Sequence, residues 1–443
     1  MHRSLELLRR LVLVLVGVTL PFEHFAISSI VVFLTPNKLV TALLLVFVAL
    51  QWAVERRRPP HDPKRLWVLF FLVVLVISAL QSILYGVSAD PVRRDLTTWY
   101  SLALFYFVMI YTLKTRRDLD VLLGAFTVGA VAAVFSGWLG WGEVVETTKF
   151  GERLSGEGGG PNLLAFNLLI ALSGTASLYF TSKSRGKRLV YLATLAIIPI
   201  GVVATLSRSG TIGLAVMGVF WAVRFRRLGF LRYAAPALAL LILAAILAPE
   251  NAVKRLSTLT PQGFQADESA HGRLTMWYGA ARAFVSNPIT GVGLSGYKTF
   301  AGEEGLRGTG LHSAYLQVLG EQGLIGFVPW VAILVLAWSE FSRAWTGARR
   351  LRAREDPELN VLGLRAGLLQ IGFFGILIMS VAQPSMRHKG LWLLLALSTV
   401  VQALVRARIR ALEPSEDAAQ VAWTARALTA PPPLSPSLDA NPR

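Results

Sequence analysis

The sequence predicts an all-α polytopic membrane protein with about twelve transmembrane helices and one long external loop that carries an amphipathic helix. Of its 443 residues, 54% are apolar and only 16% are charged, whereas soluble domains have about 45–50% apolar and about 25% charged residues. The apolar residues also form blocks of about 18 or more, the length that crosses a bilayer. These observations exclude a soluble enzyme, a secreted protein and a fibrous protein.

The predicted spans follow one another along the chain. The first apolar run, residues 11–22, has a basic flank like a signal sequence, but no small-residue cleavage site follows, so we interpret it as an uncleaved first helix. The spans are expected at residues 8–22, 37–54, 66–85, 96–113, 119–141, 161–181, 189–206, 210–223, 231–248, 314–341, 363–382 and 390–405. We expect one transmembrane domain over 1–410, containing the long loop 249–311, and a disordered, proline-rich cytoplasmic tail over 411–443.

Clusters of Lys and Arg predict the orientation. The clusters lie at residues 56–65, 114–117, 183–188, 224–232, 343–354 and 406–410. All fall on one side if both termini are cytoplasmic, as the positive-inside rule requires. The net charge of +18 then reflects topology, and no nucleic-acid partner is expected. The opposite side, with the long loop, would be periplasmic in a protein of the bacterial inner membrane.

The long loop has a helical pattern. Apolar side chains recur at helical spacing at Leu274, Trp277, Tyr278, Ala281, Phe284 and Val285. Asn287-Pro288 ends this pattern. We expect the helix to lie along the membrane surface, in contact with membrane lipid.

Arg208 is the only charged residue between Leu189 and Val223. As one helix, residues 189–223 would be about 52 Å long, whereas the hydrocarbon core is about 30 Å thick. The run must therefore break, and residues 207–210 form the natural turn. Arg208 at the outer face is either a snorkelling side chain or part of an anion site at membrane level.

Arg273 and His312 mark the two sides of the long loop. Arg273 opens the amphipathic helix, where a cation opposes the helix dipole; it is either a surface arginine or part of an anion site. His312 lies where the loop re-enters the membrane. A histidine there either packs at the interface or exchanges a proton near neutral pH.

Other candidate sites have weaker patterns. The chain has no cysteine, and its outer histidines lack metal-ligand spacing, so neither a metal nor another cofactor is expected. Glu23, in the first outer loop, is a further candidate base or metal ligand. The glycine-rich stretch 151–160 lacks the Gly-Lys-Ser/Thr ending of a P-loop. Asn162 after it is expected to cap the next span.

Four segments, in this order, resemble motifs of the O-antigen ligase and polymerase superfamily. They are Arg153-Leu-Ser-Gly156 with Pro161-Asn162 and Ala165; Leu206-Ser-Arg208-Ser-Gly210; Gly272-Arg273-Leu-Thr-Met-Trp277 with Asn287-Pro288-Ile-Thr-Gly291-Val-Gly293; and His312-Ser313 with Gly323-Leu-Ile-Gly326. The last is similar to the signature His-(Asn/Ser/Gln)-x9-Gly-x-x-Gly, with Ser313 where Asn is commoner. The resemblance runs from about residue 153 to 326. No large periplasmic domain follows the last span, unlike in the protein-O-oligosaccharyltransferase branch.

The resemblance implies a glycosyltransferase whose donor is a glycan linked to undecaprenyl diphosphate. Arg208 and Arg273 would stabilise the diphosphate, His312 would act as general base, and Arg153, Asn162 and Ser313 would bind substrate. The product would be inverted at the anomeric carbon, without a metal. A ligase that uses lipid A–core as acceptor is preferred, because the outer loops are of moderate length and the outer-face motifs form one compact set.

Two alternatives remain open. The motifs are shared with O-antigen polymerases, whose acceptor would be a second lipid-linked repeat. A lipid-linked glycan transporter is the alternative that is not an enzyme. It would need polar residues along a path through the membrane, whereas the residues singled out here gather at one face.

Overall fold

The computed structural model describes residues 2–22, 36–56, 58–140, 153–155, 160–226, 268–306, 310–350 and 356–412. Within these ranges the regular secondary structure is entirely helical, which confirms the predicted all-α class. The main helices are α1 (His2–Thr19), α2 (Pro36–Glu55), α3 (Arg65–Leu84), α4 (Ala89–Thr112), α5 (Arg116–Trp138), α6 (Gly160–Thr181), α7 (Arg185–Ala204), α8 (Arg208–Phe225), α12 (Glu268–Ser286), α13 (Tyr297–Glu303), α14 (Ala314–Gly347), α15 (Pro357–Met379) and α16 (Lys389–Leu412). Two short 3₁₀ turns, η1 (Leu20–Phe22) and η4 (Ser385–Arg387), complete the set.

Eight of the described helices are long and apolar enough to cross a membrane: α2, α3, α5, α6, α7, α14, α15 and α16. Helices α1, α4 and α8 pack in the same bundle. Large apolar side chains such as Leu66, Leu84 and Leu189 are exposed on the bundle surface, as expected where lipid surrounds the protein. The chain is therefore a multi-pass membrane protein. Predicted span 231–248 and most of the tail lie outside the described residues, so the total of about twelve spans stays a prediction.

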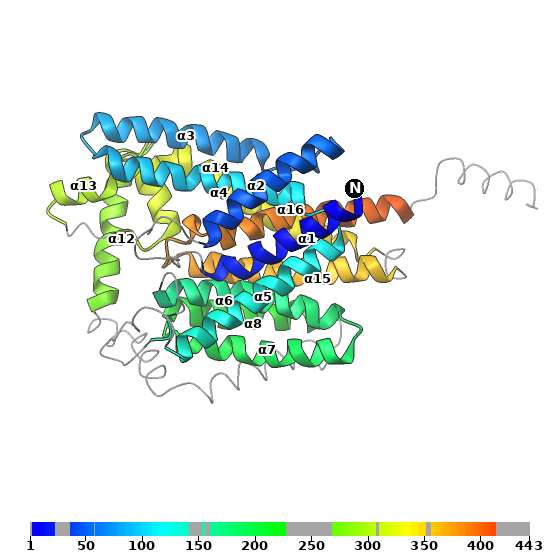
Figure 1. Cartoon of the computed structure of the whole chain (residues 1–443). Coiled ribbons are helices and arrows are strands. Elements are labelled where there is room, and N and C mark those ends of the chain that lie inside the picture. The colour runs from blue at the N-terminus through cyan, green and yellow to red at the C-terminus, as the bar shows by residue number, and fades with distance from the viewer. Residues whose placement is uncertain are drawn as a thin grey trace, which may run out of the picture.

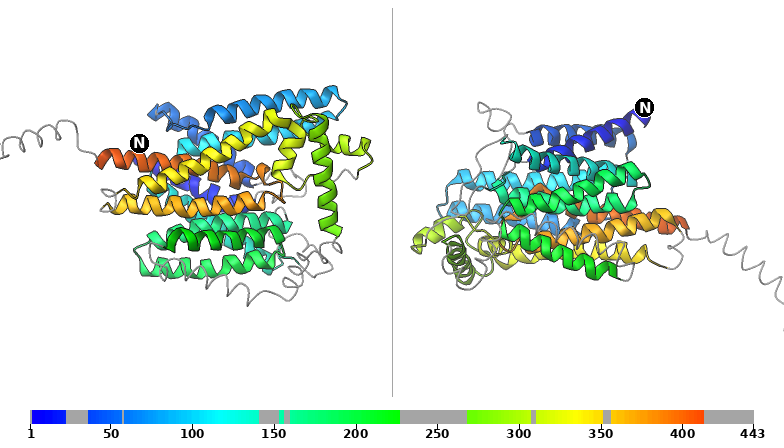
Figure 2. Two further views of the ribbon diagram at one scale, coloured as in Figure 1. Left: turned by 180° about the vertical axis from the view of Figure 1, so that it is seen from behind. Right: turned by 90° about the horizontal axis from the view of Figure 1, so that it is seen from below.

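The spans lie roughly parallel to one axis (Figure 1). Nearly the whole surface of α6 is buried, and its neighbours are α5, α7, α8 and α15. Its apolar residues show almost no preferred face, which is typical of a helix surrounded by other helices. Helix α12 crosses one end of this bundle (Figures 1 and 2). We call this the α12 end.

The opposite end holds the described parts of all six basic clusters, and we call it the basic end (Figure 1). Buried charges are paired there. Lys64, just before α3, pairs with Glu340 of α14, and Arg365 of α15 pairs with Asp120 of α5. The gathering of basic residues at one end agrees with the predicted topology, while the cytoplasmic assignment of that end stays a prediction.

Helix α12 confirms the amphipathic helix predicted in the long loop. It lies nearly perpendicular to the spans (Figure 2). Its residues Ala280 and Ala283 pack in a small apolar cluster with Tyr297 of α13. One detail of the prediction is wrong: α12 begins by Glu268, so Arg273 lies beyond its first turn rather than at its opening. A helix N-terminus therefore does not explain an anion site at Arg273.

Helix α14 is broken near its beginning. Gly323 has φ 58° and ψ −160°, so the helix axis changes there. The main-chain groups around the break bond to the segment after α12: Leu324 N–H donates to the Pro288 carbonyl at 2.9 Å. On the preceding turn, Gly293 N–H donates to the Glu321 carbonyl, also at 2.9 Å. A broken helix within a membrane protein requires such replacement partners.

Candidate functional site

Arg208 lies at the start of α8, at the predicted turn. The side chain of Ser207 caps the helix by accepting a hydrogen bond from Gly210 N–H at 3.2 Å. Leu206 adopts a left-handed conformation with φ 50°, which reverses the chain between α7 and α8. Arg208 itself is only 8% exposed. The side chain therefore does not extend into open solvent, and its part in an anion site stays a prediction.

The glycine-rich motif and the Arg208 turn form one hydrogen-bonded network. Arg153 donates from Nε to the Thr205 carbonyl at 3.1 Å and from Nη2 to Asn162 Oδ1 at 3.3 Å. Ser207 Oγ donates to the same Asn162 oxygen at 2.8 Å. The prediction that Asn162 caps its helix is wrong, because α6 already begins at Gly160 and the amide faces α8. Arg153 and Asn162 thus hold the turn that presents Arg208.

A second set of bonds links this turn to the segment that carries His312. Gln383 Nε2 donates to Ser209 Oγ at 3.4 Å. The N–H of Ala314 donates to the carbonyls of Ser380 and Gln383, at 3.0 Å each. The motifs around Arg208 and His312 therefore meet at the α12 end, through the loop between α15 and α16.

Ser313 is buried and caps α14. Its side chain accepts a hydrogen bond from Leu316 N–H at 3.4 Å. Asparagine is an equally good N-cap residue. The exchange of Asn for Ser at this position in the signature is therefore compatible with one structural role.

His312 precedes this cap and is half-buried. Burial first, and then the positive charge of Arg273, hold the pKa of the imidazole below its ordinary value. The imidazole is therefore neutral at neutral pH and can accept a proton. Arg273 lies on α12, and His312 directly precedes α14, the helix against which α12 packs.

Residues 192–331 match the O-antigen ligase family model. This match supports membership of the O-antigen ligase and polymerase superfamily. The matched segment contains Arg208, Arg273 and His312, whereas Arg153 and Asn162 precede it. No curated protein matches the chain.

Two glycine-containing motifs, around Gly291 and around Gly323, are joined by main-chain hydrogen bonds. The Asn-Pro-x-x-Gly-x-Gly segment bonds along both sides of the break at Gly323. A Cβ atom on Gly323 would lie 2.6 Å from the nitrogen of Gly291, so a side chain has no room there. The two motifs are therefore one structural unit, which joins α12 to α14.

Sequence reasoning missed an ionic cluster beside this unit. Arg387 of η4 pairs with Asp95 of α4 at 2.6 Å and lies 3.9 Å from Glu321 of α14. Ser295 also donates to Asp95, and Gln317 donates to Glu321 at 3.4 Å. A carboxylate within an apolar run can indicate such a cluster, and Glu321 lies within predicted span 314–341, which also contains Glu340. The cluster fixes the loop between α15 and α16, which holds both parts of the site.

The remaining candidates lie outside the described residues. These are Glu23, predicted as a candidate base or metal ligand, and most of the glycine-rich stretch, including Gly156. Among the described residues, no group of three or more His, Cys, Asp or Glu side chains is placed to hold a metal ion.

Proposed function

We propose that this protein is an O-antigen ligase of the bacterial inner membrane. It transfers polysaccharide en bloc from undecaprenyl diphosphate to lipid A–core oligosaccharide, at the periplasmic end of the bundle, which we assign to the α12 end. The proposal rests on the match of residues 192–331 to the O-antigen ligase family model and on the bonds that bring the Arg208 turn and the His312 segment together at this end. A cation next to a base that stays unprotonated suits an anionic leaving group and a weakly acidic nucleophile.

The reaction is a single displacement. His312 removes the proton from an acceptor sugar hydroxyl, and the hydroxyl oxygen forms a bond to the anomeric carbon of the donor. The bond from that carbon to the diphosphate breaks, and the diphosphate leaves with the electron pair from the opposite face. The anomeric centre is therefore inverted. Nuclear magnetic resonance of the linkage tests this step, since retention would require a second displacement.

Arg208 and Arg273 stabilise the leaving group. Their planar guanidinium groups donate paired hydrogen bonds to phosphate oxygens. Such a donor contributes about 2.7–4 kcal/mol where it meets charge that develops in the transition state. In other reactions of diphosphates, a divalent cation stabilises the negative charge of the leaving group. The two arginines supply that positive charge here, so the proposed reaction uses no metal.

Three residues support the proposed site indirectly: Arg153, Asn162 and Ser313. Arg153 and Asn162 hold the Ser207 turn, and Ser313 caps the helix that follows His312. We therefore assign their part in substrate binding to the placement of Arg208 and His312, instead of the direct contacts expected from the resemblance.

A lipopolysaccharide gel tests the function. A strain that lacks the gene is complemented with the wild-type protein or with His312→Ala. If the deletion removes all capping of lipid A–core and lipid-linked polymer accumulates, the protein is a ligase. If single-repeat caps remain while the ladder disappears, it is a polymerase. Full rescue by His312→Ala would contradict the base assignment and favour a transporter.

A further inference from the structure

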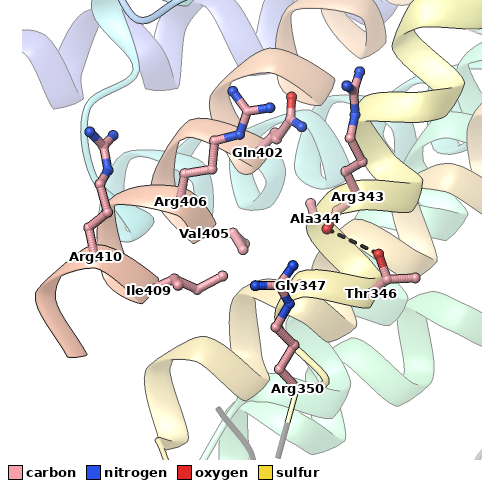
Figure 3. A pocket seen from close by; sticks show the side chains of 10 residues that line it. All are labelled: Arg343, Ala344, Thr346, Gly347, Arg350, Gln402, Val405, Arg406, Ile409 and Arg410. Carbon is pink, nitrogen blue, oxygen red and sulfur yellow. Dashed lines mark hydrogen bonds between the residues drawn. The ribbon is translucent and has the colours of Figure 1, made fainter. Parts of the chain in front are cut away.

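A basic pocket lies at the basic end, far from the residues of the proposed reaction. Its cavity of about 520 Å³ is lined by Arg343 of α14, by Arg350 just after that helix, and by Arg406 and Arg410 of α16. Figure 3 shows the four side chains extending from two facing segments around the gap. Arg406 and Arg410 are four residues apart and so lie on one face of α16.

The four arginines differ from their neighbours in how their charge is balanced. None of them forms an ion pair with a carboxylate among the described residues. Arg408, on the same helix, pairs with Asp356 at 2.6 Å. Arg349 instead lies over the ring of Trp345, 4.8 Å from its centroid. The pocket therefore brings together four positive charges that have no carboxylate partner among the described residues, and their mutual repulsion favours an anion between them.

The inner wall of the pocket orients these charges. With its amide oxygen facing the guanidinium groups, Gln402 accepts from Arg406 Nη2 at 3.0 Å and from Arg343 Nε at 3.3 Å. Ser339 Oγ also accepts from Arg343 at 2.8 Å. Val405 and Ile409 form an apolar floor against Gly347. The site thus has fixed donors around an apolar base.

The place of the pocket indicates the source of its anion. It lies at the basic ends of two candidate spans, α14 and α16, where lipid headgroups are expected. Basic pockets between transmembrane helices commonly hold phosphate headgroups. We propose that this pocket binds the phosphodiester headgroup of an anionic phospholipid. The inference is independent of the transfer reaction and of the orientation of the bundle.

Native mass spectrometry of the purified full-length protein tests the proposal. The probes are phosphatidylglycerol, cardiolipin, zwitterionic phosphatidylethanolamine and inorganic phosphate, each added to the detergent solution. We expect one tightly held anionic phospholipid per chain. The double variant Arg343→Gln/Arg406→Gln should bind it about tenfold or more weakly, since each basic residue near a membrane surface contributes about a fivefold gain.

The matched control is Arg117→Gln/Arg185→Gln. Both residues are exposed at the same end of the bundle and lie outside the pocket, so the double change removes equal charge. This control should bind lipid like the wild type. An equal loss of affinity for anionic phospholipid in both double variants would overturn the proposal, because it would show a general attraction between the lipid and the basic surface. The proposal would also be overturned if the protein retained phosphatidylethanolamine as well as it retains the anionic phospholipids. Displacement of the bound anionic phospholipid by millimolar inorganic phosphate would overturn it too.

Folding of the variants is checked by their melting temperature in lipid-free detergent. If the pocket variant melts early, Arg410→Gln replaces it, because Arg410 is exposed and at the rim. The expected loss of lipid affinity is then about fivefold. Undiminished binding in Arg410→Gln would contradict the proposal.

Discussion

Leu324 N–H donates to the carbonyl oxygen of Pro288 across a distance of 2.9 Å, and so joins the broken helix α14 to the end of α12. Ile325 makes the same kind of bond to Ile289 at 3.1 Å. Arg273 lies on α12 and His312 directly precedes α14, so these bonds set the relation between the proposed cation and the proposed base. The geometry of the site depends on backbone contacts between two motifs that are far apart in sequence.

Gly323→Ala tests this dependence. Its left-handed conformation and the nearby Gly291 nitrogen leave no place for a methyl group. We expect a loss of stability of about 2 kcal/mol or more, seen as a lower melting temperature of the purified protein. Gly302→Ala is the matched control, because a Cβ atom there would contact nothing. Equal melting temperatures of the two variants would show that the break tolerates a side chain.

The pH dependence of transfer tests the pairing of His312 with Arg273. Activity falls as the pH decreases through the pKa of His312, because imidazolium cannot accept a proton. Burial and Arg273 lower that pKa, so we expect the acidic limb of kcat/KM below the ordinary histidine value of about 6.5.

Arg273→Gln removes the nearby positive charge. The pKa of His312 should then increase, and the acidic limb, normalised to its own plateau, should move to higher pH. Arg273→Lys retains the charge and should leave the limb in place even if the rate decreases. A limb that stays fixed in Arg273→Gln would show that the charge of Arg273 does not act on His312.

Arg208→Lys should reduce transfer by about 10²- to 10³-fold, because a point charge does not reproduce a guanidinium fork. The assay measures transfer in detergent with a saturating lipid-linked donor. The exposed Arg226→Lys, at the other end of α8, serves as the control and should retain full activity. Full activity of Arg208→Lys would contradict the need for paired hydrogen bonds from a guanidinium group. Arg208 would then contribute only its positive charge or a structural contact.

The buried pair of Lys64 and Glu340 is expected to stabilise the basic end only while both partners are present. Both side chains are fully buried. Removing one partner should cost about 3–5 kcal/mol, whereas Lys64→Met/Glu340→Leu together should restore much of that loss. Unfolding of all four proteins in a double-mutant cycle measures the coupling. Additive effects of the two single changes would contradict it.

The transfer reaction is expected to continue in EDTA, because the proposed stabilisation of the diphosphate comes from Arg208 and Arg273. The measurement is the initial rate of the purified protein before and after dialysis against the chelator. A loss that added divalent cation restores would contradict the metal-independent mechanism and return attention to Glu23.

The sequence allowed the spans and the turn at Arg208 to be predicted because both follow from local physics. Apolar blocks must match the thickness of a bilayer, and the stretch from Leu189 to Val223 is too long to be one span. Helix α12 was predicted for the same reason, since its apolar spacing is local. Its beginning was misplaced, because apolar spacing alone does not mark the residue at which a helix begins.

The contacts that build the site could not be predicted in this way. Asn162 was expected to satisfy its own helix, but it bonds to Ser207, which lies 45 positions further on. The pairing of Arg387 with Asp95 joins residues 292 positions apart. Such partners depend on how the helices pack, and one sequence contains no direct record of that packing. The proposed roles of Arg208, Arg273 and His312 stay predictions until they are measured.

The perpendicular placement of α12 predicts that the proposed transfer reaction is sensitive to the thickness of the bilayer. Backbone bonds fix α12 to the α14 break, so Arg273 stays at a set height relative to the spans. The diphosphate of a lipid-linked donor instead follows the membrane surface. A host bilayer with longer acyl chains would raise that surface past Arg273, and a thinner one would lower it. Lipid chain length should therefore change the KM for the donor even where every residue of the site is intact.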